Sequence, residues 1–250
     1  MKALILAAGY GTRLYPLTKR YPKCLLPIAQ RPILDYIKEK LARLKKIKEI
    51  LIVTNERFFQ NFLDWAGKLQ DNRGLNIKVI SDGTKTEKDR LGAIGDIYFA
   101  LTKGRIDEDI LIIGGDNLFE EDLTAFTKFA LSKKPQVSLG VYDIEKKSLA
   151  GKYGVVKLGP KDSKVIDFRE KPVRPLSSLI ATCLYYIPRE KLKYFSGYFK
   201  DPQNERDSSG SFIRWLSKED DVYGYVFKKH WYDIGDPQVY KEADKVFSNL

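Results

Sequence analysis

The chain of 250 residues contains only two cysteines and one histidine. Cys24 and Cys183 stand in apolar surroundings without metal-like spacing, so we expect two reduced core thiols and neither a disulfide framework nor a zinc site. The single histidine, His230, precedes Trp231, and we expect it to pack there instead of acting as a catalyst.

Long apolar runs are also missing. No stretch approaches the roughly 20 residues that span a bilayer, and the first two residues lead into a strand-like run instead of a signal peptide. We therefore expect a cytoplasmic protein without membrane partners. Internal repeats are absent, including the hexapeptide repeats of a β-helix domain, so we expect one domain over residues 1–250.

Charge of one sign is in excess: 44 Lys and Arg against 33 Asp and Glu give a net charge of +11. Such a balance fits nucleic acid, anionic membranes or small polyanionic substrates, but also a plain solvated surface rich in Lys and Glu. The densest basic run, residues 43–48, ends a predicted helix, where cations complement the helix dipole. No nucleic-acid-binding motif accompanies it, and we expect no nucleic-acid partner.

Short apolar runs alternate with helical periodicity through the first half of the chain. Predicted strands cover residues 3–7, 49–54, 77–80, 110–113 and 137–141, and predicted helices cover residues 32–44, 56–69 and 91–101. Continuous Val, Ile and Leu runs are typical of strands covered on both faces. The alternation predicts an α/β fold with a Rossmann-like, doubly wound, mostly parallel mixed sheet.

The second half has shorter predicted strands, at residues 154–158, 165–169, 180–187 and 222–228, separated by turn-rich stretches. We expect it to form a small α+β insertion packed on the first sheet. A final helix over residues 237–247 begins with proline in its first turn. The single domain is thus expected to have two parts, residues 1–145 and 146–250.

The first predicted strand runs into a turn rich in small residues, Ala8-Gly9-Tyr10-Gly11-Thr12. Small residues let backbone N–H groups approach an anion, so this turn could hold a phosphate, although such glycines also make plain turns. Leu14 stands where a dinucleotide fingerprint has its third glycine, and no Gly-Lys-Ser/Thr follows. These two nucleotide-binding motifs are therefore disfavoured.

A longer pattern resembles a known family. Residues 6–18 (LAAGYGTRLYPLT) and 22–28 (PKCLLPI) resemble the signature of the sugar-1-phosphate nucleotidylyltransferases, the glucose-1-phosphate thymidylyltransferase-like nucleotidyl transferases. Further matches follow in order at residues 112–117 (IIGGDN), 153–156 (YGVV), 168–172 (FREKP) and 231–235 (WYDIG). The matches cover almost the whole chain.

The resemblance implies an enzyme that transfers a nucleoside monophosphate from a nucleoside triphosphate to a sugar 1-phosphate. The products are a nucleotide sugar and pyrophosphate, and the implied cofactor is Mg²⁺. Residues 1–145 would be the nucleotide-binding part and residues 146–250 the sugar-binding part. This chemistry needs charge neutralisation more than a protein base, because the attacking phosphate is already ionised.

The resemblance also implies roles for individual residues. Arg13 would neutralise the departing pyrophosphate, and Lys23 would reach the α-phosphate or the attacking oxygen. The implied nucleotide-binding residues are Leu6, Ala8, Gly9, Gly11, Thr12, Arg13 and Gly92, the last in the charged base-reading segment of residues 81–92. The implied catalytic residues are Arg13, Lys23 and Asp116, the metal ligands Asp116 and Asp233, and the substrate-binding residues Gly154, Glu170 and Lys171.

Simpler interpretations stay open for several of these residues. Arg13 and Lys23 could be solvated surface residues, and Asp116 could cap a helix beginning near Glu120. Asp233 could be a turn residue beside Gly235.

The chain departs from the family pattern at two positions. Asp236 replaces a threonine and could add a water-mediated metal contact or cap the final helix. Cys183 stands where relatives place a glycine beside the sugar, which leaves the shape of the sugar pocket open.

Other functions compete with the leading one. The acceptor could be a non-sugar phosphate such as a polyol or choline phosphate, or the chain could bind nucleotide sugars without turnover. A glycosyltransferase with an Asp-x-Asp metal motif is disfavoured because Asn117 and Leu118 follow Asp116. The base, the sugar and the formation of a homo-oligomer are left open by the sequence.

Overall fold

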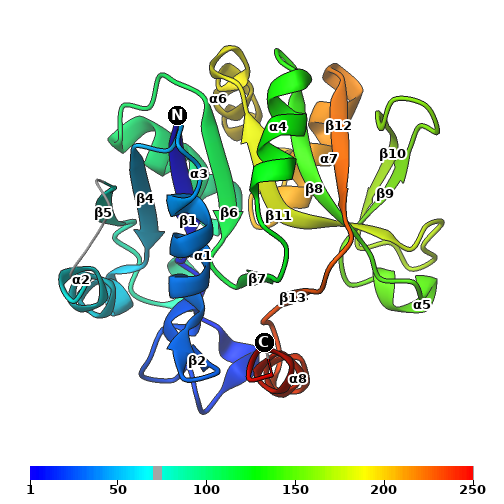
Figure 1. The fold of residues 1–250 in the computed structure, drawn as a ribbon. Helices are drawn as coiled ribbons and strands as arrows, with labels where there is room; N and C mark the ends of the chain where they lie inside the picture. Colours follow the sequence, from blue (N-terminus) through cyan, green and yellow to red (C-terminus); the bar gives the residue numbers. More distant parts are fainter. Residues whose placement is uncertain (70–74, 250) are drawn as a thin grey trace.

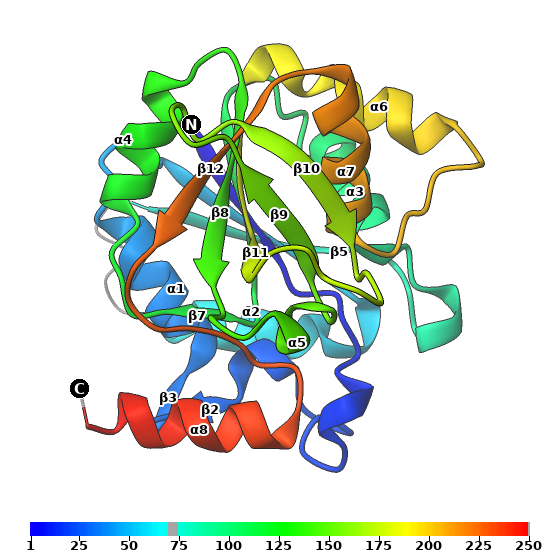
Figure 2. The same ribbon diagram turned by 90° about the vertical axis from the view of Figure 1, so that its right-hand side faces the viewer.

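The computed structural model describes residues 1–69 and 75–249, which are arranged around a nine-stranded mixed sheet (Figures 1 and 2). Seven strands follow the order β10-β9-β11-β6-β1-β4-β5, and β8 and β12 branch from β11. The nine strands are β1 (Lys2–Leu6), β4 (Glu49–Thr54), β5 (Asn76–Ser81), β6 (Ile110–Gly114), β8 (Val137–Asp143), β9 (Gly154–Leu158), β10 (Val165–Glu170), β11 (Leu179–Ile187) and β12 (Val222–Phe227).

The first half of the chain supplies a parallel block. β1 pairs in parallel with both β4 and β6, and β5 pairs in parallel with β4. In this register Leu6 lies opposite Val53 on one side and Gly114 on the other. Since the carboxyl ends of these strands share one edge, the loops that follow β1 and β6 meet there.

The second half continues the same sheet. β11 pairs antiparallel with β6, which places Leu184 opposite Ile113. Along its other edge β11 pairs with β8, and near its start it pairs with β9 on the edge that it shares with β6. The start of β11 therefore lies between the two branches, β8–β12 and β9–β10, which Figure 2 shows facing the viewer. The α/β class and the mixed sheet are confirmed. The prediction placed the second half as an insertion packed on the first sheet. In the structure its strands instead extend that sheet, because β11 hydrogen-bonds to β6.

Helices cover both faces of the sheet, because each central strand is apolar on both sides. Ile5 and Ile113 face the cluster that contains α1 (Ile33–Ala42), α2 (Phe59–Gly67), α4 (Thr124–Ser132) and α8 (Pro237–Phe247). Leu4 and Ile112 face the cluster that contains α3 (Gly92–Lys103), α6 (Lys193–Lys200) and α7 (Ser209–Glu219). The helices α6 and α7 were not predicted.

Small elements complete the fold. The short strands are β2 (Pro27–Ile28), β3 (Arg31–Pro32), β7 (Asn117–Phe119) and β13 (Trp231–Asp233), and α5 (Lys147–Ala150) is a single turn. The 3₁₀ turns are η1 (Thr12–Leu14), η2 (Lys23–Leu25), η3 (Glu56–Phe58), η4 (Glu87–Asp89) and η5 (Arg189–Lys191). β13 pairs antiparallel with β7, which sets Asp233 opposite Asn117. This pairing joins the end of the chain to the loop after β6.

Within the described part of the chain, every helix is too short or too polar to cross a bilayer.

Candidate active site

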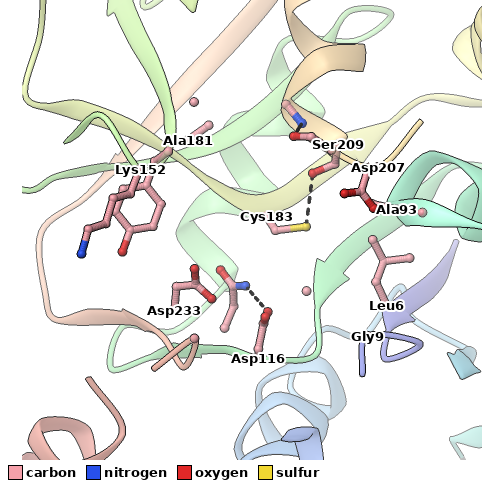
Figure 3. Close-up of a pocket in the computed structure, with 18 of the residues that line it drawn as sticks. Leu6, Gly9, Ala93, Asp116, Lys152, Ala181, Cys183, Asp207, Ser209 and Asp233 are labelled. Atoms are coloured by element: carbon pink, nitrogen blue, oxygen red, sulfur yellow. Dashed lines mark hydrogen bonds between the residues drawn. The ribbon is translucent and has the colours of Figure 1, made fainter. Parts of the chain in front are cut away.

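A cavity of about 530 Å³ opens at the carboxyl edge of β1 and β6. In Figure 3 the glycine turn and α3, marked by Leu6, Gly9 and Ala93, lie at one end, and Lys152 lies at the other. Asp116 and Asp233 lie between the two ends, and Cys183 and Ser209 lie across from them. Ten of the residues to which the resemblance assigns a role line this cavity: Leu6, Ala8, Gly9, Arg13, Gly92, Asp116, Gly154, Glu170, Lys171 and Asp233.

The glycine turn separates into lining residues and supporting residues. A β-carbon on Gly9 would have no atom within 4 Å, so Gly9 presents open backbone to the cavity. Gly11 instead holds the turn: its φ is +62°, and its carbonyl accepts a hydrogen bond of 2.6 Å from the Thr18 hydroxyl. The Thr12 hydroxyl is 3.3 Å from a carboxylate oxygen of Glu87. Gly11 and Thr12 do not line the cavity, and they support the shape of the turn instead.

Asp116 and Asp233 form the polar centre of the cavity, and Lys23, which is not among the lining residues, contacts this centre through Asp116. The Lys23 ammonium donates to Asp116 Oδ2, and the Asn117 side-chain amide donates to Asp116 Oδ1 over 2.8 Å. The Trp231 indole holds Asn117 in turn, because it donates to the Asn117 amide oxygen over 2.8 Å. The backbone N–H of Ile234 donates to the Asp116 carbonyl over 3.0 Å and so joins the two segments. The carboxyl groups of Asp116 and Asp233 thereby come within hydrogen-bonding reach of each other.

The electrostatics of this centre follow from burial and mutual charge. Burial would raise the pKa of Asp116, but Lys23 and the Asn117 amide hold it below its usual value. For Asp233, burial and the neighbouring charge of Asp116 raise the pKa to about 7. Burial would lower the pKa of Lys23, but the two carboxylates raise it, so the lysine stays charged. The centre thus holds two carboxyl groups and one fixed cation.

Arg13 brings a second cation to the same region. Its side chain is exposed and packs over Gly235, where a β-carbon would lie 2.9 Å from Nη2. The positive charge of Arg13 also opposes the rise in the pKa of Asp233. Gly235 therefore leaves room for the guanidinium beside the carboxyl pair.

The far end of the cavity contains Gly154, Glu170 and Lys171. A β-carbon on Gly154 would lie 2.5 Å from the Phe168 ring and 3.0 Å from Glu170 Oε2, so only glycine fits. Glu170 Oε1 accepts a hydrogen bond of 2.6 Å from the Ser208 hydroxyl, and Oε2 is buried without a partner among the described residues. Lys171 is exposed, and its ammonium lies 3.8 Å from Glu170 Oε1.

The start of α7 also lines this end, and the sequence analysis did not identify it. Ser208 caps the helix by accepting from the Gly210 N–H, and a side chain on Gly210 would overlap the Glu170 carboxylate. The Ser209 hydroxyl lies 2.9 Å from that of Tyr185 and 3.7 Å from the Cys183 sulfur. The sequence did contain a signal for the start of this helix: Ser208, a typical N-cap residue, precedes apolar residues at helical spacing, including Phe212 and Leu216.

Gly92 begins α3 in a conformation that favours glycine, with φ at +77°. A β-carbon there would lie 2.6 Å from the Arg206 carbonyl oxygen. The next N–H groups, of Ala93 and Ile94, bond to the carbonyls of Asp207 and Arg206 over 3.2 and 3.0 Å. The start of α3 is thus joined to the segment before α7.

Comparisons with known proteins show the family of the chain. The family model described as "Nucleotidyl transferase" matches residues 2–249. The chain belongs to the nucleotidyl transferase family.

Curated relatives in this family include two archaeal proteins. A "Bifunctional protein GlmU" of Methanocaldococcus jannaschii is 30% identical over 98% of this chain and 54% of its own length. A "Putative mannose-1-phosphate guanyltransferase" of Sulfolobus acidocaldarius is 30% identical over 96% of this chain and 61% of its own length. The chain therefore spans about half to three-fifths of these relatives.

Solved structures share the fold. A putative glucose-1-phosphate thymidylyltransferase from Bacillus anthracis, in complex with a sucrose, has a TM-score of 0.84 and 23% identity and covers 100% of this chain and 96% of its own. A UDP-glucose pyrophosphorylase complexed with UDP-glucose has a TM-score of 0.79 and 22% identity and covers 99% of this chain and 98% of its own. The chain therefore shares the fold of these solved structures over almost its whole length.

The structure decides several of the simpler interpretations. Asp116 does not cap a helix, because Asn117 begins a strand and α4 begins only at Thr124. Asp236 does cap α8: its Oδ1 accepts from the backbone N–H groups of Gln238 and Val239, each over 3.0 Å. His230 is exposed, lies 2.8 Å from a Glu120 carboxylate oxygen and stacks on Tyr232, so the expected packing on Trp231 was wrong.

The cysteines are free thiols. Cys24 is buried, and Cys183 is partly buried at the cavity wall. Burial and the nearby charge of Asp116 raise the pKa of both thiols to about 12. Neither thiol is ionised near neutral pH. Among the described residues, no cluster of three or more Cys, His, Asp and Glu side chains could hold a metal.

Proposed function

We propose that this chain transfers a nucleoside monophosphate from a nucleoside triphosphate to a sugar 1-phosphate and releases pyrophosphate. The observation that carries this proposal is the convergence of three residues from distant segments: Asp116 and Asp233 line the middle of one cavity, and the largely buried Lys23 binds Asp116. Curated family members whose names describe sugar-phosphate nucleotidyl transfer support it.

In this reaction a phosphate oxygen of the acceptor attacks the α-phosphorus of the triphosphate. A new P–O bond forms, the bond between the α- and β-phosphates breaks, and pyrophosphate leaves with both electrons of that bond. Negative charge accumulates on the transferring phosphate, so positioned cations lower the barrier. Lys23, which stays charged, would contact the α-phosphate or the attacking oxygen.

Arg13 would bind the departing pyrophosphate. Its guanidinium is exposed at the cavity and offers several donors in a fixed plane, which suits phosphate oxygens. The open backbone at Gly9 would bind the same phosphates through N–H groups, together with Leu6 and Ala8, while Gly11 and Thr12 would hold the shape of the turn.

The carboxyl pair fits a divalent cation. Asp116 and Asp233 together can carry more negative charge than Lys23 alone balances, and burial together with the charge of Asp116 raises the pKa of Asp233 to about 7. Hard oxygen ligands of this kind suit Mg²⁺, which usually keeps several waters and phosphate oxygens in its shell. When bound, Mg²⁺ would neutralise charge on the phosphates. The ligands we assign to it are Asp116 and Asp233.

The sugar would lie at the end formed by Gly154, Glu170 and Lys171. The Glu170 carboxylate would accept hydrogen bonds from sugar hydroxyls, because one of its oxygens has no partner among the described residues. Lys171, exposed beside it, would bind the phosphate of the acceptor. Gly92 would lie next to the base at the opposite end.

The test is a matrix assay that crosses the common nucleoside triphosphates with a panel of sugar 1-phosphates, polyol phosphates and choline phosphate. Pyrophosphate release is expected only when Mg²⁺, a triphosphate and a sugar 1-phosphate are present together. Release that does not depend on the acceptor would contradict the proposal. A protein that binds a nucleotide sugar but never releases pyrophosphate would be a binding protein.

A further inference from the structure

A second pair of carboxyl groups lies at the nucleotide end of the cavity. Asp96, in the second turn of α3, lines the cavity and is only 7% exposed. Asp82 follows directly after β5 and comes within hydrogen-bonding reach of Asp96. Neither residue is in a salt bridge with any described lysine or arginine.

The hydrogen bonds around the pair call for one shared proton. Asp82 Oδ1 accepts from the N–H and the hydroxyl of Thr84 over 2.7 and 2.8 Å, which favours an ionised Asp82. Asp82 Oδ2 and Asp96 Oδ1 are both buried and have no donor among the described residues. Two buried acceptor oxygens within reach of each other are satisfied when one of them carries a proton.

The surrounding charges place that proton on Asp96. Burial, followed by the negative charges of Asp82 and Asp207, raises the pKa of Asp96 to about 8. Asp89 adds negative charge near Asp82. Arg90 does not offset these charges, because Asp207 binds its guanidinium through two contacts of 2.9 Å and Glu87 lies 3.6 Å away. Tyr10 also lies on this side, and its hydroxyl donates to Thr84 over 3.1 Å.

We propose that Asp82 and Asp96 form a proton-sharing pair that recognises the nucleobase. In this pair Asp96 Oδ2, the oxygen that does not share the proton with Asp82, accepts a hydrogen bond from an N–H at the edge of the base. The inference rests on the proposed function only in taking a nucleoside triphosphate as the ligand. The phosphates are excluded from this end, because a carboxyl pair without a cation repels them. The base is the part of the ligand that carries N–H donors.

The pair makes nucleotide binding sensitive to pH. Loss of the shared proton leaves two buried negative charges, which must separate, and the geometry that presents Asp96 to the base is lost. The free protein is then competent only in its protonated fraction, and the apparent dissociation constant rises as that fraction falls.

The experiment measures triphosphate binding by calorimetry with Mg²⁺, between pH 6.5 and pH 9.5, using the triphosphate that binds best among the common four. For the unmodified chain the dissociation constant should rise about tenfold between pH 7 and pH 9, because the pKa of Asp96 is about 8. Asp96→Asn should bind without this rise at alkaline pH, since its amide always donates to Asp82 and still offers one oxygen to the base. Asp96→Ala should bind more weakly at every pH.

Two outcomes overturn the proposal. In the first, Asp96→Asn keeps the same rise as the unmodified chain, or Asp96→Ala binds equally well. In the second, the 2′,3′-dideoxy triphosphate abolishes the difference between Asp96→Ala and the unmodified chain, which would assign Asp96 to the ribose. Near-ultraviolet circular dichroism checks that each variant is folded, and Asp82→Asn provides an independent variant of the pair.

Binding needs no turnover, so the two proposals fail separately. A chain with the expected pH profile that releases no pyrophosphate would refute the proposed function and support the carboxyl pair. A chain that turns over but binds triphosphate without the pH dependence would refute only the carboxyl pair.

Discussion

Two carboxyl pairs lie at the same cavity, the second of them through Asp96, and they differ in what neutralises their charge. Asp116 and Asp233 lie beside Lys23 and within the influence of Arg13. Asp82 and Asp96 form no salt bridge with a described cation, and Asp96 holds its proton up to a pKa of about 8. The same chemical group is thus prepared for cations and phosphates at one place and for a neutral hydrogen bond at the other. The neighbours, and not the residue type, decide which.

The most severe way to break this comparison is to remove Asp116. Asp116→Ala should lower kcat by at least about 10³-fold, because Lys23 loses its acceptor and the carboxyl pair loses the member that stays ionised. Pyrophosphate release measures the loss. Asp64→Ala, which removes an exposed carboxylate on α2, should keep full activity. Activity of Asp116→Ala within tenfold of the unmodified chain would remove Asp116 from the mechanism.

Removal of the Lys23 cation should make the pair of Asp116 and Asp233 resemble the pair of Asp82 and Asp96, which shares a proton. Without the charge of Lys23, we expect the pKa of Asp116 to rise and the two carboxyl groups to share a proton. Lys23→Gln should therefore lower kcat/KM by about 10²-fold, the usual effect of removing one positioned donor. Lys128→Gln, an exposed lysine on α4, is the matched control. Equal effects of the two substitutions would show that Lys23 has no special role.

The sequence predicted one pair and missed the other, and the reason is physical. Asp116 and Asp233 stand in ordered motifs at strand ends, where ligands of open α/β sheets gather. Asp96 lies in the helix predicted over residues 91–101, on the side away from its apolar residues Ile94, Ile97 and Leu101. The sequence alone therefore cannot distinguish it from a solvated residue. Its burial arises because Asp82 and the segment around Asp207 meet it from distant parts of the chain.

The fold shows the same division. The apolar strands of the first half were predicted well, and β4 matches its expected bounds, because a continuous buried run is a local signal. The helices α6 and α7 were missed. In α6, for example, Lys193–Lys200 contains a glycine, a serine and four aromatic residues, and all of these have low helix propensity. Packing stabilises them instead: the rings of Phe195 and Phe212 stack at 4.1 Å.

Glu170 offers a third case for this comparison. It is a carboxylate without a carboxylate partner, and it lies against the start of α7. Gly210→Ala would push a methyl group into the Glu170 carboxylate and displace it from Ser208. We expect the KM for the sugar 1-phosphate to rise about tenfold while the KM for the triphosphate is unchanged. Gly197→Ala on α6, where the added β-carbon meets nothing within 4 Å, is the control. A parallel rise in both KM values would place Glu170 outside the sugar site.

The smallest expected effect concerns stability and tests the second pair without any ligand. The folded chain holds the Asp96 proton up to a pKa of about 8, whereas an unfolded aspartate releases it near pH 4. The stabilisation from this proton is therefore complete below about pH 4 and is lost as the pH rises through about 8. Asp96→Asn cannot ionise, so its Tm should exceed that of the unmodified chain by at least about 2 °C at pH 9 and by less at pH 6. Asp64→Asn, on an exposed carboxylate, should show no such divergence. A constant difference between Asp96→Asn and the unmodified chain across this range would mean that Asp96 is already ionised in the folded protein.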